Sequence, residues 1–206
     1  MERIFKIRCS KIGEIMSNAK VKGELSAACK THLHTWYANE NEEIYSKYIE
    51  KGNAVEDDLI DFMAEQLGFG MAEKNKISVS DEYIQGTCDV ALLDTIVDVK
   101  SAWNRKTLHQ QVVDGLDKDY EWQLLGYCHL YKKSNGILFF GLMNTPETNR
   151  SDEVIYDDMP ANERWHAYNV PFDAERINLV IERVKQCRVY LEGYDNMIKN
   201  KLGKIK

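Results

Sequence analysis

Within the segment from Gly86 to Lys100, the carboxylates of Asp89 and Asp98 and the amine of Lys100 are spaced so that they could do chemistry. Asp98 and Lys100 lie two residues apart in a run of β-branched residues, which favours a strand. Side chains alternate between the two faces of a strand, so these charged groups project from one face while Val97 and Val99 pack into the core on the other. The pattern predicts a carboxylate and an ammonium group side by side on a sheet.

A tight turn at Leu93–Asp94 would add a second carboxylate to this face. A two-residue loop there pairs Asp89 directly with Asp98, with the two Cβ atoms about 4.5–5.5 Å apart. Two carboxylates this close repel each other unless a cation lies between them. Mg²⁺ suits this position, because it prefers oxygen ligands and is usually held by carboxylates together with water and substrate phosphate.

The chemistry that these groups support is phosphodiester hydrolysis. A bound Mg²⁺ can polarise a phosphoryl oxygen, lower the pKa of a bound water and offset charge on the leaving oxygen. Lys100 adds a cation that can hold the attacking water or the scissile phosphate. The ordinary alternative is an exposed hairpin whose polar face carries a surface ion pair of little energetic consequence. The D-x-K pattern alone also occurs by chance in many proteins.

The order of the charged motifs resembles that of the PD-(D/E)xK nuclease superfamily. Asp89 is followed, after eight residues, by the D-x-K stretch Asp98–Lys100, which matches the D-x(n)-(D/E)-x-K signature. Cys88 stands where the signature has proline. This departure is typical of the RecB-like and YqaJ-like branches, in which the strand begins G-x-x-D, as Gly86–Asp89 does. The resemblance spans Ile4 to Met143 through short motifs.

Two further motifs of those branches are present in the same order. Glu56 lies on an expected helix upstream, and a Q-x-x-x-Y helix with Gln123 and Tyr127 follows downstream. Each motif has an ordinary alternative. Glu56 could be a solvated acid like its two acidic neighbours, and the glutamine and tyrosine, one helical turn apart, could belong to a stripe that faces the core.

The resemblance assigns a role to each of these side chains. It implies that a single Mg²⁺ or Mn²⁺ ion, or a pair of them, is bound, and that Lys100 orients the attacking water. It implies no iron–sulfur cluster, because the relatives that carry one have several C-terminal cysteines, whereas only Cys187 follows Cys128 here. The implied metal ligands are Glu56, Asp89, Asp98 and Val99, and the implied catalytic residues are Glu56, Asp89, Asp98, Lys100, Gln123 and Tyr127.

The opening of the chain resembles the start of phage-type YqaJ exonucleases, in which a serine and basic residues precede the first helix. Ser10 is expected to cap a short helix over residues 12–16. Backbone amides at a helix N-terminus, a serine hydroxyl and an arginine can together hold a phosphate. Arg8, Ser10 and Lys11 are therefore expected to bind substrate, with Arg8 and Ser10 at a terminal 5′-phosphate. The ordinary alternative is a serine cap with solvated cations.

The elements that must position these side chains follow from hydrophobic spacing. The order of helices, a cluster of strands, a helix, two strands and a helix predicts a single-domain α/β core with a mixed central sheet flanked by helices. Residues 1–70 form a mainly helical part, 75–143 the catalytic strands and the Q-x-x-x-Y helix, and 144–206 a polar excursion, a strand and a closing helix. Expected helices cover residues 25–39, 43–67, 120–131 and 174–198, and expected strands cover 77–79, 83–93, 95–100, 136–143 and 165–170.

Composition restricts the class of protein less than the motifs do. The net charge of −6 gives no support to nucleic-acid binding, yet basic residues gather at Arg3–Lys11 and Lys100–Lys106, so a local basic groove is compatible with it. Five scattered cysteines without a C-x-x-C pattern indicate neither disulfides nor a zinc site. No apolar run is long enough to span a membrane and no signal peptide is evident, so a cytoplasmic protein is expected.

The function that the resemblance implies is a metal-dependent DNA exonuclease of phage-type recombination or DNA end processing. It further implies a ring-shaped homotrimer that threads duplex DNA with a free end and passes single strands to an annealing protein. An endonuclease of restriction or repair type is the alternative enzyme. A non-catalytic DNA-binding relative is the alternative outside enzymes, although intact acids and lysine at every motif position disfavour it.

Overall fold

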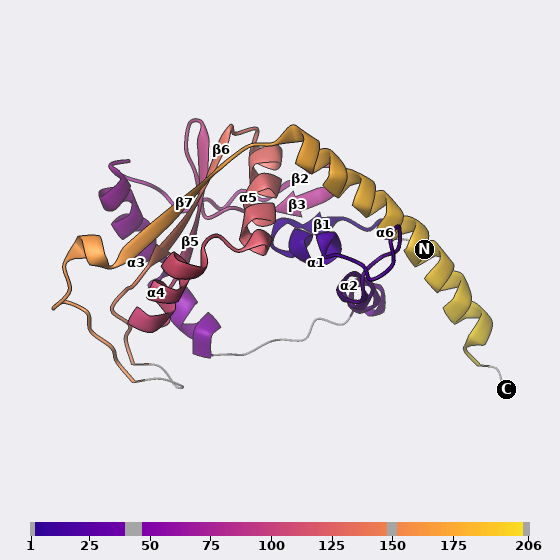
Figure 1. Cartoon of the computed structure of the whole chain (residues 1–206), viewed down its shortest axis with the longest axis horizontal. Coiled ribbons are helices and arrows are strands. Elements are labelled where there is room, and N and C mark those ends of the chain that lie inside the picture. Colours follow the sequence, from indigo (N-terminus) through magenta and orange to yellow (C-terminus); the bar gives the residue numbers. More distant parts are fainter. Residues whose placement is uncertain (1–2, 40–46, 148–151, 204–206) are drawn as a thin grey trace.

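The computed structural model describes residues 3–39, 47–147 and 152–203, which form two sheets covered by helices (Figure 1). The larger sheet has four strands in the order β4-β5-β6-β7. The pair β5–β6 is parallel, whereas β4–β5 and β6–β7 are antiparallel, so the predicted mixed sheet is confirmed. Its strands are β4 (Val90–Ala91), β5 (Thr95–Ser101), β6 (Asn135–Gly141) and β7 (Trp165–Pro171).

The smaller sheet has three short strands in the order β1-β3-β2. They are β1 (Ile7–Arg8), β2 (Val79–Ser80) and β3 (Ile84–Gly86). The chain passes from β3 of this sheet to β4 of the larger one within residues 87–89. The sequence pattern predicts one continuous strand over residues 83–93, and that prediction is wrong, because these residues are divided between β3 and β4.

The helices begin and end at recognisable signals. Ser26 accepts a hydrogen bond from the amide of Cys29 and caps α2, while Asn104 does the same for α4 through the amide of Thr107. Gly68, with φ of +71°, follows the last residue of α3. The helices are η1 (Cys9–Lys11), α1 (Ile12–Met16), α2 (Ala27–Ala38), α3 (Lys47–Leu67), α4 (Arg105–Asp114), α5 (Lys118–Tyr131), η2 (Ala161–Glu163) and α6 (Ala174–Lys201).

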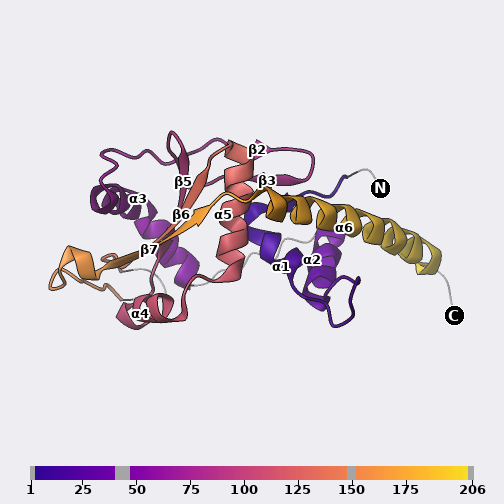
Figure 2. The same ribbon diagram turned by 45° about the horizontal axis from the view of Figure 1, so that its top comes forward.

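Both faces of the larger sheet are buried under helices, with α5 on one side and α3 on the other (Figures 1 and 2). Ile96 and Leu138 belong to the core that includes α1, α5 and α6. Val97 and Val99 belong to a second core beneath α3. The predicted inward direction of the two valines is confirmed, but the opposite face of β5 lies under α5, so the open, wet hairpin considered as an alternative is wrong.

Three other expectations need correction or fall outside the structure. Ser10 does not cap a helix, because it lies inside the 3₁₀ turn η1, and no side chain caps α1. The polar helix α4 was not expected from the sequence. The expected helical residues 43–46 lie outside the described part of the chain.

Among the described residues, no helix is long and apolar enough to cross a membrane.

Candidate active site

The β4–β5 hairpin brings the two predicted carboxylates together. Val90 pairs with Val97, and the amide of Leu92 donates to the carbonyl of Thr95 at 2.8 Å. This register confirms the predicted turn at Leu93–Asp94 and, continued by one pair, sets Asp89 opposite Asp98.

Asp89 is anchored by the backbone of the neighbouring strand. Its Oδ2 accepts a hydrogen bond from the amide of Val99 at 2.8 Å. Burial and repulsion from Asp98 raise the pKa of Asp89 to about 7, although Lys100 and the Val99 amide act in the opposite direction. Around neutral pH the Asp89 carboxyl is therefore partly protonated when no cation is bound.

Asp98 is the buried centre of the site, with 1% of its surface exposed. Its Oδ1 accepts a hydrogen bond from Gln123 Nε2 at 3.1 Å, and its Oδ2 lies 2.6 Å from Lys100 Nζ. Apart from that ion pair, Oδ2 accepts no well-formed hydrogen bond within the described residues. A buried carboxylate oxygen with unused acceptor capacity is costly unless a cation or donor meets it.

Lys100 is held as a cation. Burial alone would lower its pKa, but the charges of Asp98 and Asp89 outweigh burial and raise the pKa above the usual lysine range. Lys100 Nζ also lies 5.7 Å from the ring centroid of Tyr120, a cation–π contact. Lys100 therefore stays protonated at neutral pH and supplies charge and hydrogen bonds instead of accepting a proton.

Helix α5 delivers Gln123 and Tyr127 to the carboxylates. Gln123 Nε2 lies 3.2 Å from the Tyr127 hydroxyl as well as bonding Asp98, and both side chains are buried. The helix can approach this closely because residue 126 is glycine: a Cβ there would lie 2.5 Å from Ile12 Cδ1. The two interpretations of this helix face, as a core stripe and as part of the site, are therefore compatible, because the face packs in the core and also contacts Asp98.

Glu56 lies near the two aspartates without joining them. Its negative charge adds a small contribution to the raised pKa of Asp89, so it lies within electrostatic reach of that carboxyl. Its Oε2 instead forms an ion pair with Lys74 Nζ at 2.8 Å. Within the described residues no three His, Cys, Asp or Glu side chains are close enough to form a ready metal cluster. The carboxylates that do converge are Asp89 and Asp98.

The donor set nevertheless fits a hard divalent cation. Asp89 and Asp98 face each other, the pKa of Asp89 is raised by burial and by the charge of Asp98, and Asp98 Oδ2 has acceptor capacity left over. A divalent ion would offset the repulsion between the two carboxylates and would bind the unused acceptor of Asp98, and such ions prefer carboxylate oxygens. The side chain of Val99 is packed in the core beneath α3, so only its backbone could contribute a ligand.

The N-terminal residues expected to bind substrate lie on the surface beside α5. Arg8, Ser10 and Lys11 are all exposed, and η1 packs against α5. Lys11 Nζ forms an ion pair with Glu14 at 2.6 Å, and its charge also acts on Asp119 in the first turn of α5. Lys11 therefore stands near the N-terminal end of α5, whereas Arg8 lies on β1, where it pairs with Gln85 of β3.

Sequence reasoning missed Tyr120 and Lys74 as neighbours of the site. Tyr120 stands one turn before Gln123 on α5, so its helical spacing was a usable signal. Lys74 lies in an irregular segment and meets Glu56 only through the tertiary fold. No local pattern marks it.

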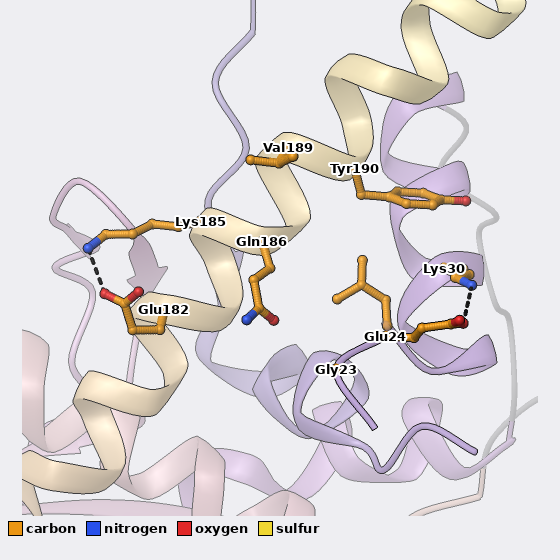
Figure 3. A pocket seen from close by; sticks show the side chains of 9 residues that line it. Gly23, Glu24, Lys30, Glu182, Lys185, Gln186, Val189 and Tyr190 are labelled. Carbon is orange, nitrogen blue, oxygen red and sulfur yellow. Dashed lines mark hydrogen bonds and ion pairs between the residues drawn. The ribbon is translucent and has the colours of Figure 1, made fainter. Parts of the chain in front are cut away.

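A separate cleft lies away from these residues, between α6 and the segment that leads into α2 (Figure 3). It has a volume of about 660 Å³. Its charged side chains pair with each other, Lys30 with Glu24 at 3.7 Å and Lys185 with Glu182 at 2.7 Å. It contains none of the candidate site residues.

Solved structures match the fold over nearly the whole chain. A phage related exonuclease from Haemophilus somnus 129PT has a TM-score of 0.81 at 23% sequence identity, covering 95% of this chain and 97% of that chain. The alkaline exonuclease LHK-Exo from Laribacter hongkongensis has a TM-score of 0.72 at 12% identity, covering 97% and 94%. Its complex with dAMP gives 0.71 at 14% identity, covering 95% and 92%. No protein-family model and no curated protein matches the chain. At these identities the likeness establishes a shared fold.

Proposed function

We propose that this chain, which has the fold of phage-related and alkaline exonucleases, is a metal-dependent DNA exonuclease. The observation that carries the proposal is the buried carboxylate of Asp98, held between Gln123 and Lys100 and set opposite Asp89. Opposed acids with a fixed ammonium group suit hydrolysis of a phosphodiester, in which negative charge develops on oxygen.

Each residue has a defined part in the proposed reaction. Asp89 and Asp98, with Glu56 and the backbone of Val99, would hold Mg²⁺ or Mn²⁺, which when bound polarises the scissile phosphate and acidifies water. Lys100 holds the attacking water or a phosphate oxygen through its ammonium. Gln123 fixes the orientation of Asp98, and Tyr127 fixes Gln123. Lys74 pairs with Glu56 Oε2, so it competes with the cation for that oxygen, while Oε1 is not part of the pair.

The proposal is tested by digestion of end-labelled linear duplex DNA in Mg²⁺, with closed circular DNA of the same sequence alongside. Linear DNA should be degraded from its ends while the circle survives. Degradation of the circle would establish an endonuclease, and survival of both substrates would leave a non-catalytic DNA-binding protein.

Metal dependence has a readout that is independent of turnover. Ca²⁺ and Mg²⁺ should each raise the melting temperature of the native protein at millimolar concentrations, because binding to the folded state alone stabilises it by mass action. The increase should vanish in the Asp89→Asn variant, which removes one charge of the opposed pair. An unchanged melting temperature in both metals would rule out a cation at these carboxylates.

The proposal extends to substrate and assembly. LHK-Exo has been crystallised with dAMP, which supports a deoxynucleotide-binding site on this fold. Arg8 and Ser10 are proposed to hold a terminal 5′-phosphate, and Lys11 a neighbouring phosphate. A ring of three chains would concentrate local basic groups around a duplex despite the net charge of −6, and an annealing protein in the same cytoplasm would receive the single strand. Measuring the mass of the particle in solution tests the trimer.

A further inference from the structure

Beyond the candidate active site, aromatic and basic side chains meet at the C-terminal end of β5. Tyr48, near the start of α3, and Trp103, just after β5, have ring centroids 4.9 Å apart with planes at 70°. Lys47 Nζ lies 5.0 Å from the Trp103 ring centroid and 5.4 Å from that of Tyr48. Tyr48 is 59% exposed, so much of its ring is available to another molecule.

A buried lysine, Lys51, contacts Trp103 of this aromatic pair. Lys51 is 3% exposed, and its Nζ donates a hydrogen bond to the carbonyl of Trp103 at 2.8 Å. The same ammonium lies 5.5 Å from the Trp103 ring centroid and 5.9 Å from that of Tyr156. Burial lowers the pKa of Lys51 to about 8. The hydrogen bond and the contact with its ring hold Trp103 in position.

The local charge is positive in a chain whose net charge is −6. Neither Lys47 nor Lys51 has a carboxylate within ion-pair distance among the described residues, whereas the nearby Arg105 is paired with Asp158 at 2.9 Å. Cations gathered without counter-charges favour an anionic ligand. Exposed aromatic rings beside such cations suit a ligand that also has a flat apolar face.

The position of this group relates it to the candidate active site. Glu56 follows Tyr48 by eight residues on α3, a rise of about 12 Å. Trp103 follows Lys100 by three residues, a span of about 10 Å. A strand of nucleic acid whose phosphate lay at Lys100 would therefore reach this group with a neighbouring nucleotide.

We propose that Tyr48, Trp103 and Lys47 form a binding site for an unpaired nucleotide of the DNA strand that adjoins the active site. The base stacks against the aromatic pair, and Lys47 exchanges its ring contacts for a phosphate oxygen. Lys51 is a positioning residue that holds Trp103. Because neighbouring base pairs cover both faces of a base inside a duplex, the site selects single-stranded DNA, whose bases can unstack. This inference rests on the proposed function, since it identifies which form of the substrate the surface beside that site receives.

The test measures the affinity of the full chain for a short fluorescent oligothymidylate by anisotropy, in EDTA so that nothing is hydrolysed. Tyr48→Leu should weaken binding by about 5- to 150-fold, the range expected when one base loses an aromatic partner. Tyr48→Phe, which keeps the ring, should bind like the wild type. Phe69→Leu, just past the other end of α3, is the matched aromatic control and should also leave binding unchanged.

Two further measurements separate stacking from a merely structural effect. With an oligonucleotide that lacks bases, Tyr48→Leu and wild type should bind equally, because the lost contact is to the base. Lys47→Gln should lower the slope of log affinity against log salt by about 1, as expected for one phosphate contact. Equal binding of Tyr48→Leu and wild type to the normal oligonucleotide would overturn the inference, as would a loss that persists without bases.

The proposed function and this inference fail separately. If the wild type degrades linear duplex DNA but Tyr48→Leu binds oligothymidylate normally, the nuclease stands and the stacking site is wrong. If binding depends on Tyr48 but no DNA is degraded, the stacking site stands and the nuclease is wrong.

Discussion

The carboxylate of Asp98 has a different neighbour on each oxygen. Gln123 donates to one oxygen and fixes its direction, while Lys100 supplies charge at the other. Because the pKa of Lys100 is raised above the usual lysine range, the site holds a cation beside Asp89, whose pKa of about 7 makes its charge depend on what it binds.

Removal of the Lys100 cation should therefore reduce turnover with little effect on folding. Lys100→Met keeps the length of the side chain but loses the charge, and kcat should fall by about 100- to 1000-fold, the usual effect of losing one group that stabilises transition-state charge. The measurement is the initial rate on linear duplex DNA, with circular dichroism to check the fold. Lys22→Met, at an exposed position away from these acids, is the control. A folded Lys100→Met protein with wild-type turnover would contradict the assignment.

Arg8 should distinguish the chemical state of the DNA end. Arg8→Ala should slow digestion of 5′-phosphorylated duplex more than that of 5′-hydroxyl duplex, by about 1.5–3 kcal/mol for one charged hydrogen bond. The measurement is kcat/KM on the two substrates in parallel. Equal slowing on both would mean that Arg8 contacts the backbone generally, and the 5′-phosphate site would then be abandoned.

At the scale of elements, the close approach of α5 to α1 and η1 decides where Gln123 lies. A Cβ at position 126 would sit 2.5 Å from Ile12 Cδ1 and 3.0 Å from Cys9 Sγ. Both neighbours are fully buried, so they have little room to move aside. The position of α5 therefore depends on the absence of a side chain at residue 126.

Gly126→Ala should destabilise the protein by about 1–3 kcal/mol, the usual cost of overpacking a core. It should also lower activity more than stability alone explains, because α5 carries Gln123. Gly193→Ala is the matched control: it lies within α6 with nothing inside 4 Å of its Cβ, and should stabilise by about 0.5–1 kcal/mol. The measurement is urea unfolding together with activity. Similar effects for both variants would contradict the packing argument.

Element by element, the sequence predicted what local patterns can encode. The turn at Leu93–Asp94 and the strand after it follow from alternation and turn chemistry, and both are confirmed. The split of residues 83–93 between two sheets carries no local signal, because both halves have the same strand-like composition. Helix α4 is hard to predict from the sequence because Leu108 is its one buried residue, which leaves little apolar periodicity. Its N-cap residue, Asn104, is the usable local signal.

The site was less predictable than the strands that carry it. The pairing of Asp89 with Asp98 follows from a single hairpin, so spacing was sufficient. The contact of Asp98 with Gln123 joins β5 to α5, and only the resemblance indicated that these motifs meet. The ion pair of Glu56 with Lys74 depends on packing of α3 against an irregular segment, and neither spacing nor resemblance predicted it.

The buried ammonium of Lys51 should make the free energy of unfolding depend on pH. Its pKa is lowered to about 8, so between about pH 8 and the unfolded value of 10.5 the unfolded chain binds more protons than the folded one. Stability from this group therefore rises with pH across that window and is constant below it.

Buried cysteines and tyrosines with raised pKa values act in the opposite direction, so the measured quantity is a difference. The free energy of unfolding of wild type minus that of Lys51→Met should increase by on the order of 1 kcal/mol from pH 8 to 10.5, a value reduced for partial solvation of the ammonium. A difference that stays flat over this range would mean that Lys51 is not desolvated in the folded protein.

At the scale of the whole molecule, the two sheets differ in how much chain holds them together. The strands of the larger sheet that flank the site, β5 and β6, pair along their full seven-residue lengths, whereas β1, β2 and β3 have two or three residues each. Asp89 follows directly on the crossover between them, with the smaller sheet on its N-terminal side.

Such a difference allows sub-global opening, in which the smaller sheet exchanges its amide hydrogens while β5 and β6 stay protected. Opening would release the chain that leads into Asp89 and loosen one side of the opposed acid pair. Activity would then be lost when the smaller sheet opens, at a temperature below the cooperative melting transition of the whole domain. The working limit of the protein would be set by its weakest sheet, whatever the stability of the rest.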